Sequence, residues 1–299
     1  MKKDIKLIGT LPHIHNKKEV EEMMSSEYIS EVRFNTGVNE LLEEKKIIEI
    51  LKSLEEKFNK KIWIDLKGRQ LRVNSWADTS YEAIELNHKI DIEYPAKVIF
   101  RGGNTSNIIH TKGNKIILEE PPERAVGKGQ SVNIKAKSLI IEGYLTQLDK
   151  EFIKESKELG MNNYMASFLE SFDDLVEILS LNTNATIVAK IESLKGLRFA
   201  LSNNIAIQPM AARDDLWLEC KDDINVLKAL QEIIKKYPSA ICASRLFSSL
   251  NKEAEISLSD MEDLELMYLY GYKTFMLQDE IQGPKLEKAL KGWRSFIYE

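Results

Sequence analysis

The chain has 299 residues, 43% of them hydrophobic, and is therefore long and apolar enough to bury a large core. Its net charge is -5, with basic and acidic residues interspersed, so neither a nucleic-acid-binding surface nor a polybasic membrane-binding segment is expected. No apolar run approaches the roughly eighteen residues of a membrane span, and the polar N-terminus does not resemble a signal sequence. Cys220 and Cys242 make no disulfide framework and are expected as small buried hydrophobic residues. These features predict a cytoplasmic protein.

Short β-branched runs alternate with amphipathic helical patterns along most of the chain. The first part predicts strands at residues 5–12, 29–34 and 61–68, and helices at 16–26 and 40–58. The later part predicts strands at 164–168, 186–190, 205–210, 240–243 and 274–277, and helices at 146–159, 172–181, 194–202, 224–236, 260–270 and 285–296. Eight strands that alternate with helices predict an α/β fold, a closed (β/α)8 TIM barrel rather than an open sheet.

The alternation breaks after the third predicted strand. Residues 74–137 contain short alternating runs separated by Gly-Gly, Lys-Gly-Asn and Pro-Pro turn signals, without helix-length periodicity. This pattern predicts a small all-β domain at 74–137 inserted into a barrel formed by 1–73 and 138–299. The insertion leaves from the carboxyl end of a strand, where the loops of a barrel build its active site.

Charged residues close two neighbouring apolar runs abruptly. Lys190 and Glu192 end the run ATIVAKIE, and Arg213, Asp214 and Asp215 follow the run IAIQPMAA. An acidic residue after a strand is also common in a solvated loop or at a helix N-cap. If the two strands are adjacent and parallel, however, Glu192 and Asp215 could share Mg²⁺, which takes one or two protein carboxylates and fills its other positions with water and substrate oxygens.

The carboxyl ends of all barrel strands meet at one mouth, so the residues that follow each strand are expected together there. They combine carboxylates with guanidinium and ammonium groups, which suits a small carboxylate or phosphate bound through arginine and a metal. The residues in question are Arg33, Asn35, Asp65, Lys67, Arg72, Ser167, Lys190, Glu192, Arg213, Asp215, Ser244, Arg245, Gln278, Asp279 and Glu280.

Six of these segments resemble those of the pyruvate kinase family, in the family's order, along the barrel from Lys6 to about Glu280. The segments are VRFNTG, IDLKGRQLR, MASFLES, AKIES, MAARDDL and ICASRLF. The resemblance implies a barrel that binds phosphoenolpyruvate or pyruvate, with a shortened lid domain at 74–137. The sequence ends after the eighth strand and its helix, so no counterpart of the family's C-terminal domain is expected.

The resemblance also implies a role for individual residues. Glu192 and Asp215 would bind Mg²⁺ or Mn²⁺, and Asn35 and Asp65 would bind K⁺. Lys190 would stabilise the transferring phosphoryl group or the enolate oxygen, Arg33 would contact the phosphate, and Ser244 would lie near the methyl carbon of pyruvate. The substrate-binding set implied in this way is Arg33, Arg72, Lys190, Arg213, Asp214 and Ser244.

Several positions depart from the family's pattern. Gly37 replaces a serine that supplies a K⁺ ligand, and Val38 and Arg69 replace a histidine and a proline on the nucleotide side. Asp214 and Trp217 replace two glycines of the loop at the substrate carboxylate. A side chain at Asp214 would bring negative charge close to an anionic ligand, which is unfavourable.

Three functions therefore stay open. The first is a pyruvate-kinase-like phosphotransferase acting on phosphoenolpyruvate and ADP or ATP, compatible with a homo-oligomer. The second is a Mg²⁺-dependent lyase, aldolase or decarboxylase that forms the enolate of a 2-oxo acid without a nucleotide. The third is a metabolite-binding protein that kept the barrel without turnover. Lys190 next to Ile-Glu favours the kinase, and the altered nucleotide-side residues favour the lyase.

Overall fold

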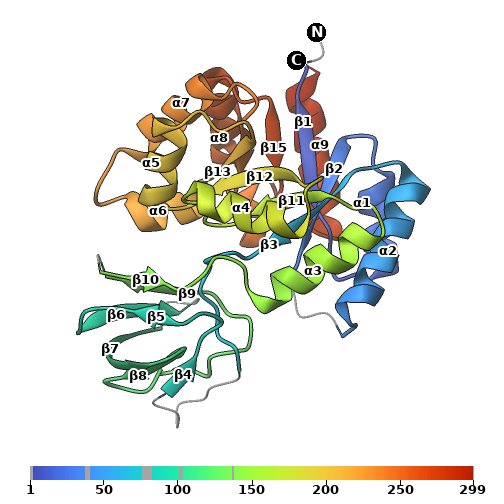
Figure 1. Ribbon diagram of the computed structural model, residues 1–299. Helices are drawn as coiled ribbons and strands as arrows, with labels where there is room; N and C mark the ends of the chain where they lie inside the picture. Colours follow the sequence, from blue (N-terminus) through green and yellow to red (C-terminus); the bar gives the residue numbers. More distant parts are fainter. Residues whose placement is uncertain (1–2, 38–40, 76–82, 101–103, 137, 299) are drawn as a thin grey trace. The chain divides into compact units, whose positions relative to one another are not determined.

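The computed structural model describes residues 3–37, 41–75, 83–100, 104–136 and 138–298 (Figure 1). The chain divides into two compact units. The barrel unit is formed by the chain up to Thr36, by the segment that ends at Leu66, and by the chain from Lys150 onward. The β unit contains Gly37 and Lys67–Asp149.

The barrel unit is built on a closed ring of parallel strands, which confirms the predicted (β/α)8 barrel. Going around the ring, its strands are β1 (Lys6–Thr10), β15 (Thr274–Met276), β14 (Ile241–Ala243), β13 (Gln208–Ala212), β12 (Thr186–Ile191), β11 (Asn163–Ala166), β3 (Ile62–Leu66) and β2 (Ile29–Asn35). β12 is hydrogen-bonded to β13 with Lys190 opposite Met210, so the two strands that precede Glu192 and Asp215 are adjacent.

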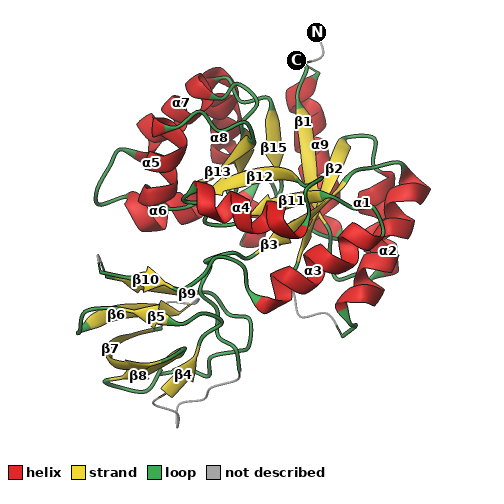
Figure 2. Ribbon diagram, viewed as in Figure 1, coloured by secondary structure: helices red, strands yellow, loops and turns green. Residues whose placement is uncertain are grey.

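Helices lie around the outside of the barrel strands (Figure 2). They are α1 (Lys17–Ser25), α2 (Glu44–Phe58), α3 (Gln147–Glu158), α4 (Phe172–Leu181), α5 (Leu194–Ser202), α6 (Arg213–Cys220), α7 (Val226–Lys236), α8 (Leu258–Tyr270) and α9 (Pro284–Ile297). A short 3₁₀ helix, η1, spans Ser248–Asn251. No helix of the described residues is both long and apolar enough to span a membrane.

The sequence of α7 illustrates how these helices form. Its buried residues recur every three to four positions, which gives one apolar stripe facing the barrel: Val226, Ala229, Leu230, Ile233 and Ile234. The side chain of Asn225 accepts a hydrogen bond from the backbone N–H of Lys228 and so caps the first turn. Lys235 and Lys236 in the last turn complement the negative end of the helix dipole.

Two local predictions differ from the structure. The predicted strand at 205–210 lies later, at Gln208–Ala212, and the residues after it form α6, which the sequence did not predict. In α6 the core-facing residues Leu216 and Cys220 alternate with the exposed Trp217 and Leu218, so no clear apolar face marks the helix. α2 begins at Glu44, and the predicted start at residue 40 lies outside the described residues.

The interior of the barrel changes from apolar to polar along the strands. One apolar layer contains Ile8, Trp63, Met165, Val188, Met210, Ile241, Ala243 and Met276. Successive side chains alternate between the two faces of a strand, so the residue two positions later points into the same interior. At that next level, β3 supplies Asp65 and β12 supplies Lys190, both buried. The candidate site is this second, polar layer.

The β unit has an antiparallel sheet and a core of its own. Five strands pair in the order β4 (Ala83–Glu85), β8 (Lys115–Leu118), β7 (Thr105–Lys112), β6 (Ala96–Phe100) and β9 (Val132–Lys135). A second, two-stranded pairing joins β5 (Ile90–Asp91) to β10 (Ile140–Ile141). The buried core contains residues such as Leu86, Val98, Ile108 and Ile116, all of which come from this unit.

A buried carboxylate joins the two ends of the β unit. Asp149 accepts hydrogen bonds from the backbone N–H groups of Lys67 at 2.8 Å and Gly68 at 3.1 Å, just after β3. It also accepts from the backbone and hydroxyl of Thr146, at 3.0 and 2.8 Å, and so completes the N-terminal cap of α3. Burial raises the pKa of Asp149, and these donors act in the opposite direction. The carboxylate therefore ties the segment that follows β3, at Lys67 and Gly68, to the segment that leads into α3, at Thr146.

Candidate functional site

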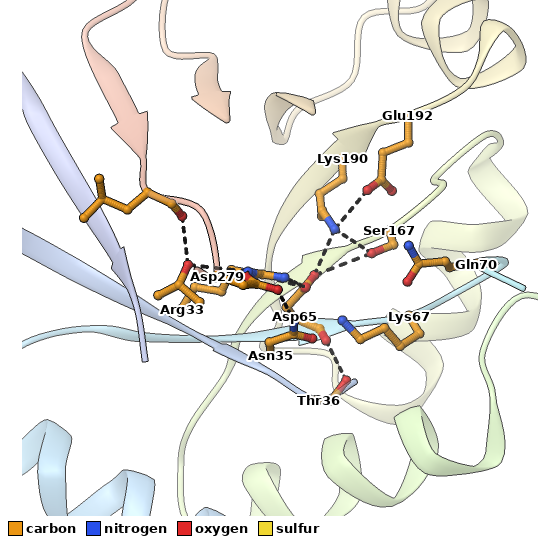
Figure 3. A network of polar contacts seen from close by, with 12 residues as sticks. Arg33, Asn35, Thr36, Asp65, Lys67, Gln70, Ser167, Lys190, Glu192 and Asp279 are labelled. Carbon is orange, nitrogen blue, oxygen red and sulfur yellow. Dashed lines mark hydrogen bonds and ion pairs between the residues drawn. The ribbon is translucent and has the colours of Figure 1, made fainter. Parts of the chain in front are cut away.

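The centre of the polar layer is Asp65, whose side chain is fully buried (Figure 3). Its Oδ2 accepts hydrogen bonds from Nε and Nη2 of Arg33, at 3.0 and 2.5 Å. Its Oδ1 lies 3.3 Å from Nζ of Lys190 and accepts a hydrogen bond from the Ser167 hydroxyl at 3.5 Å. Two cations from different strands thus share one buried carboxylate, which holds both in fixed positions.

Lys190 is held on three sides. Besides Asp65, its ammonium group donates a hydrogen bond to Oγ of Ser167 at 2.8 Å and lies 3.0 Å from Oε1 of Glu192. Burial by itself would lower the pKa of Lys190, but Asp65 and Glu192 act more strongly in the other direction, and the net pKa is raised. The raised pKa and the two carboxylate partners favour the charged ammonium form, which suits stabilising an anion rather than accepting a proton.

Glu192 is a buried carboxylate of this layer whose pKa is strongly raised. Burial raises its pKa to about 7, with further increases from the charges of Asp215 and Asp65 and an opposing effect from Lys190. Its Oε2 accepts a hydrogen bond from the backbone N–H of Phe168 at 2.7 Å. Phe168 has a φ of 48°, in the left-handed region that non-glycine residues seldom adopt, so local strain accompanies this contact.

Asp214 and Asp215 lie in the first turn of α6, directly after β13. Burial raises the pKa of Asp215, and the charge of Lys190 acts in the opposite direction. The charge of Asp215 in turn contributes to the raised pKa of Glu192. Asp214 is half exposed and lies 3.9 Å from the guanidinium of Arg245. The negative charge that the sequence introduces at Asp214 is thus partly balanced by a neighbouring arginine.

Arg33 has a second carboxylate partner, Asp279, and the sequence did not predict this pairing. Its Nη1 donates to Oδ1 of Asp279, just after β15, and Nδ2 of Asn35 donates to the other carboxylate oxygen at 2.7 Å. The same Nη1 reaches the hydroxyl of Thr10 at 3.4 Å, and that hydroxyl donates to the backbone carbonyl of Leu277. The sequence placed Asp279 at the mouth, but its pairing depends on the closure of β15 against β1.

Arg213 lies beside the mouth in a supporting position. Its Nη1 donates to both carboxylate oxygens of Asp263, at 2.7 and 2.9 Å, and Nε donates to the carbonyl of Ala243 at 3.1 Å. Nη2 donates to the carbonyl of Ser244. Ser244 itself has a φ of 67°, so Arg213 supports a backbone segment in the left-handed region. These contacts give Arg213 a clear positioning role for the segment that carries Ser244.

The remaining nucleotide-side and substrate residues belong to the β unit. Arg72 donates from Nη1 to the carbonyl of Gly129 at 2.5 Å, and from Nε and Nη2 to the side chain of Gln70. The guanidinium of Arg69 lies 5.2 Å from the ring centre of Tyr144. Val38 lies outside the described residues. The structure therefore describes Arg72 and Arg69 within their own unit.

Comparison with known proteins finds two relatives, and both are pyruvate kinases. The chain is 26% identical to a pyruvate kinase of Thermococcus litoralis and 22% identical to a pyruvate kinase of Thermoplasma acidophilum, over 92% of its length in both cases. The chain is similar to pyruvate kinases. It spans 65% and 54% of the lengths of these two relatives, respectively. No protein-family model matches the chain.

Proposed function

We propose that the chain is a pyruvate-kinase-like enzyme that transfers a phosphoryl group between phosphoenolpyruvate and a nucleoside diphosphate, with pyruvate as the product. The observation that carries this proposal is the charged layer in which Asp65 fixes Arg33 and Lys190 at the carboxyl ends of β2, β3 and β12. The similarity to two pyruvate kinases along 92% of the chain supports it. A cytoplasmic location is part of the same proposal.

The donor set of Glu192 and Asp215 fits Mg²⁺ or Mn²⁺. Both are hard oxygen ligands, and the pKa of Glu192 is raised by burial and by the neighbouring carboxylates, so a cation would relieve their mutual repulsion. Among the described residues, no group of three or more His, Cys, Asp and Glu side chains is arranged to hold a metal. A pair of carboxylates is nevertheless the protein contribution that Mg²⁺ commonly takes. When bound, the metal would neutralise charge on the phosphoryl and enolate oxygens.

The protein's own residues would act as fixed positive charges. Lys190 would donate from its ammonium group to the transferring phosphoryl group or to the enolate oxygen, without moving, because Ser167, Glu192 and Asp65 already orient it. Arg33 would bind the phosphate, and Ser244 would contact the pyruvate methyl end. The positioned charges cost no reorganisation during the reaction, which is the main way phosphoryl transfer is catalysed.

Further contacts belong to the same proposal. The substrate contacts implied for Arg213 and Asp214 in the barrel unit, and the one implied for Arg72 in the β unit, each stay a prediction. A K⁺ ion at Asn35 and Asp65 also stays a prediction. Asp65 already has Arg33 and Lys190 as partners, so a third cation at this carboxylate would meet repulsion from both.

The decisive experiment measures pyruvate formation from phosphoenolpyruvate with Mg²⁺ and a panel of nucleoside diphosphates. Lys190→Met should lower kcat by about 100-fold or more, the scale of losing one fixed charge in a transition state. The matched control is Lys195→Met, since the Lys195 side chain is 68% exposed and pairs with Glu170 at 3.3 Å. A folded, metal-loaded protein without turnover on any nucleoside diphosphate would refute the proposal.

A second candidate function is an enolate-forming lyase or decarboxylase on a 2-oxo acid. It is favoured by the pairing of Arg33 with two carboxylates of its own chain, Asp65 and Asp279, which leaves less of its charge for a phosphate. Exchange of the pyruvate methyl protons or decarboxylation of oxaloacetate, with Mg²⁺ and no nucleotide, would support this function. Absence of both activities in folded protein would exclude it.

A further inference from the structure

Asp279 presents a carboxylate to the guanidinium that the proposed function assigns to the phosphate. Its two oxygens accept hydrogen bonds from Nη1 of Arg33 and from Nδ2 of Asn35, the latter at 2.7 Å (Figure 3). A bidentate acceptor with one negative charge thus lies against two donors from β2. A carboxylate or phosphate of a ligand would use the same two donors in the same way.

The two carboxylate partners of Arg33 differ in how tightly they are enclosed. The Asp65 side chain is 0% exposed, whereas that of Asp279 is 41% exposed at the rim of the barrel. The backbone around Asp279 is anchored, because Leu277 N–H donates to the carbonyl of Ile8 at 2.9 Å and Gln282 donates to the carbonyl of Asp279 at 2.5 Å. A rotation of the Asp279 side chain into solvent therefore leaves both the strand and the Arg33–Asp65 pair in place.

The charge balance of the site favours such a displacement. Arg33 already faces two carboxylates, Asp65 and Asp279, so the charges in direct contact with its guanidinium are more negative than positive before any ligand binds. An anionic ligand that binds while Asp279 stays in place adds to this negative charge. A ligand that replaces Asp279 moves that carboxylate away from Arg33 and accepts the hydrogen bonds of Arg33 and Asn35 in its place.

We propose that Asp279 is a specificity-determining residue that competes with the ligand for Arg33 and Asn35, so that a phosphate dianion can displace it and a simple carboxylate cannot. A free carboxylate offers the same acceptor geometry and charge as Asp279 but lacks the advantage of being tethered to the site. A phosphate dianion brings a second negative charge and a third acceptor oxygen, which outweigh that advantage. The site thereby selects phosphate esters over carboxylates of similar size.

This inference rests on the anion site of the proposed function, and its test is independent of turnover. Binding of inorganic phosphate and of acetate is measured by isothermal titration with wild-type protein and with Asp279→Ala. We expect Asp279→Ala to bind phosphate about tenfold more tightly, since no competing group has to leave, and to gain measurable acetate binding. Wild-type protein should bind phosphate but not acetate.

Glu280→Ala is the matched control, because it removes one negative charge from an exposed position next to Asp279. A general electrostatic effect would strengthen phosphate binding equally in both variants, and that outcome would overturn the proposal. Unchanged or weaker phosphate binding in Asp279→Ala would also overturn it and would assign Asp279 a purely structural role. Asp279→Asn should lie between wild type and Asp279→Ala, because its amide oxygen still accepts a hydrogen bond but carries no charge.

The link to Arg33 is tested in the Asp279→Ala background. Adding Arg33→Met should remove the gain in phosphate affinity, with folding checked by circular dichroism. Adding Asn35→Ala gives a second test that leaves the buried Arg33–Asp65 pair intact, and it should reduce the gain. If both double variants keep the full gain, phosphate binds elsewhere and the inference fails. The proposed function would fail separately, through absence of nucleotide-dependent turnover in a protein that still binds phosphate.

Discussion

Glu192 links the protonation of the polar layer to the stability of the metal-free protein. Burial raises the pKa of its carboxyl from 4.5 to about 7, so the folded state holds this proton more tightly than the unfolded state does. The stabilisation by the protonated form is complete below about pH 4.5 and is lost as the pH rises towards 7. We therefore expect the free energy of unfolding of the wild type, relative to Glu192→Gln, to fall by about 1–3 kcal/mol between pH 5 and pH 7.5.

Urea denaturation with a chelator present, at a series of pH values, measures this difference. The amide of Glu192→Gln can still accept the hydrogen bond from Phe168, so the comparison isolates the titrating charge. Glu232→Gln, at an exposed position on α7 next to Lys228, should run parallel to the wild type. Parallel curves for the wild type and Glu192→Gln would contradict the raised pKa.

At the scale of single residues, the sequence indicated which side chains face the mouth but not which of them pair. Lys190 and Glu192 are two positions apart at the end of a strand, so period-two alternation puts both on one face, and the structure joins them at 3.0 Å. The pairing of Lys190 with Asp65 and of Arg33 with Asp279 joins residues 125 and 246 positions apart. Such pairs follow from strand order and stagger around the ring, which no local pattern contains.

At the scale of elements, helices with a continuous apolar stripe were predicted within a few residues, and the irregular ones were not. α5 lies at the predicted residues 194–202, and its first turn is capped by Ser193, a residue type with a strong preference for that position. α6 was missed because exposed Trp217 and Leu218 interrupt its pattern of buried residues. This miss concerns the site directly, since α6 carries Asp214 and Asp215 in its first turn.

Asp149 allows a test of how the residues after β3 are held to the start of α3. Its carboxylate accepts four hydrogen bonds, from Lys67, Gly68 and twice from Thr146, in a fully buried position. Asp149→Ala would leave these donors buried without their acceptor, and we expect it to lower the free energy of unfolding by about 2–4 kcal/mol. The backbone amides of Lys67, Gly68 and Thr146 should exchange hydrogen faster in the variant.

Hydrogen exchange followed by mass spectrometry, together with thermal denaturation, measures both effects. Asp222→Ala, at an exposed position after α6, is the control for removing one aspartate. If Asp149→Ala keeps wild-type stability and the three amides keep their protection, the carboxylate does not hold the two segments together. The raised pKa of Asp149 has its origin in burial, so Asp149→Asn, which stays neutral, should be less harmful than Asp149→Ala.

At the scale of the whole molecule, two different periodicities in the sequence mark the barrel and the predicted insertion at 74–137. The barrel was predicted from eight alternations of strand and helix, and the closed ring confirms it. Short alternating runs and turn signals marked the intervening segment, whose described residues from Ala83 to Lys135 form strands and loops without a helix. The position of Asp149 and the full extent of the β unit, Lys67–Asp149, depend on tertiary contacts and not on a change in composition.

Separate cores predict that the two units respond separately to a core mutation. The core of the β unit contains Ile116 in β8, and all residues of that core lie between Leu71 and Ile141. Ile64 in β3 is a matched residue of the barrel unit, and both isoleucines are 0% exposed. Truncation to alanine leaves a cavity at either position and costs about 2–5 kcal/mol of the stability of the surrounding core.

We expect Ile116→Ala to accelerate hydrogen exchange in β4 and β6–β9 while β12 and β13 keep wild-type protection. We expect Ile64→Ala to accelerate exchange in the barrel strands. Local opening in such cooperative segments is the normal behaviour of folded proteins, and exchange at the level of single peptides resolves it. Equal acceleration of exchange in both units by Ile116→Ala would show instead that barrel and β unit unfold as one cooperative body, and the cores would then be coupled in stability despite having no residue in common.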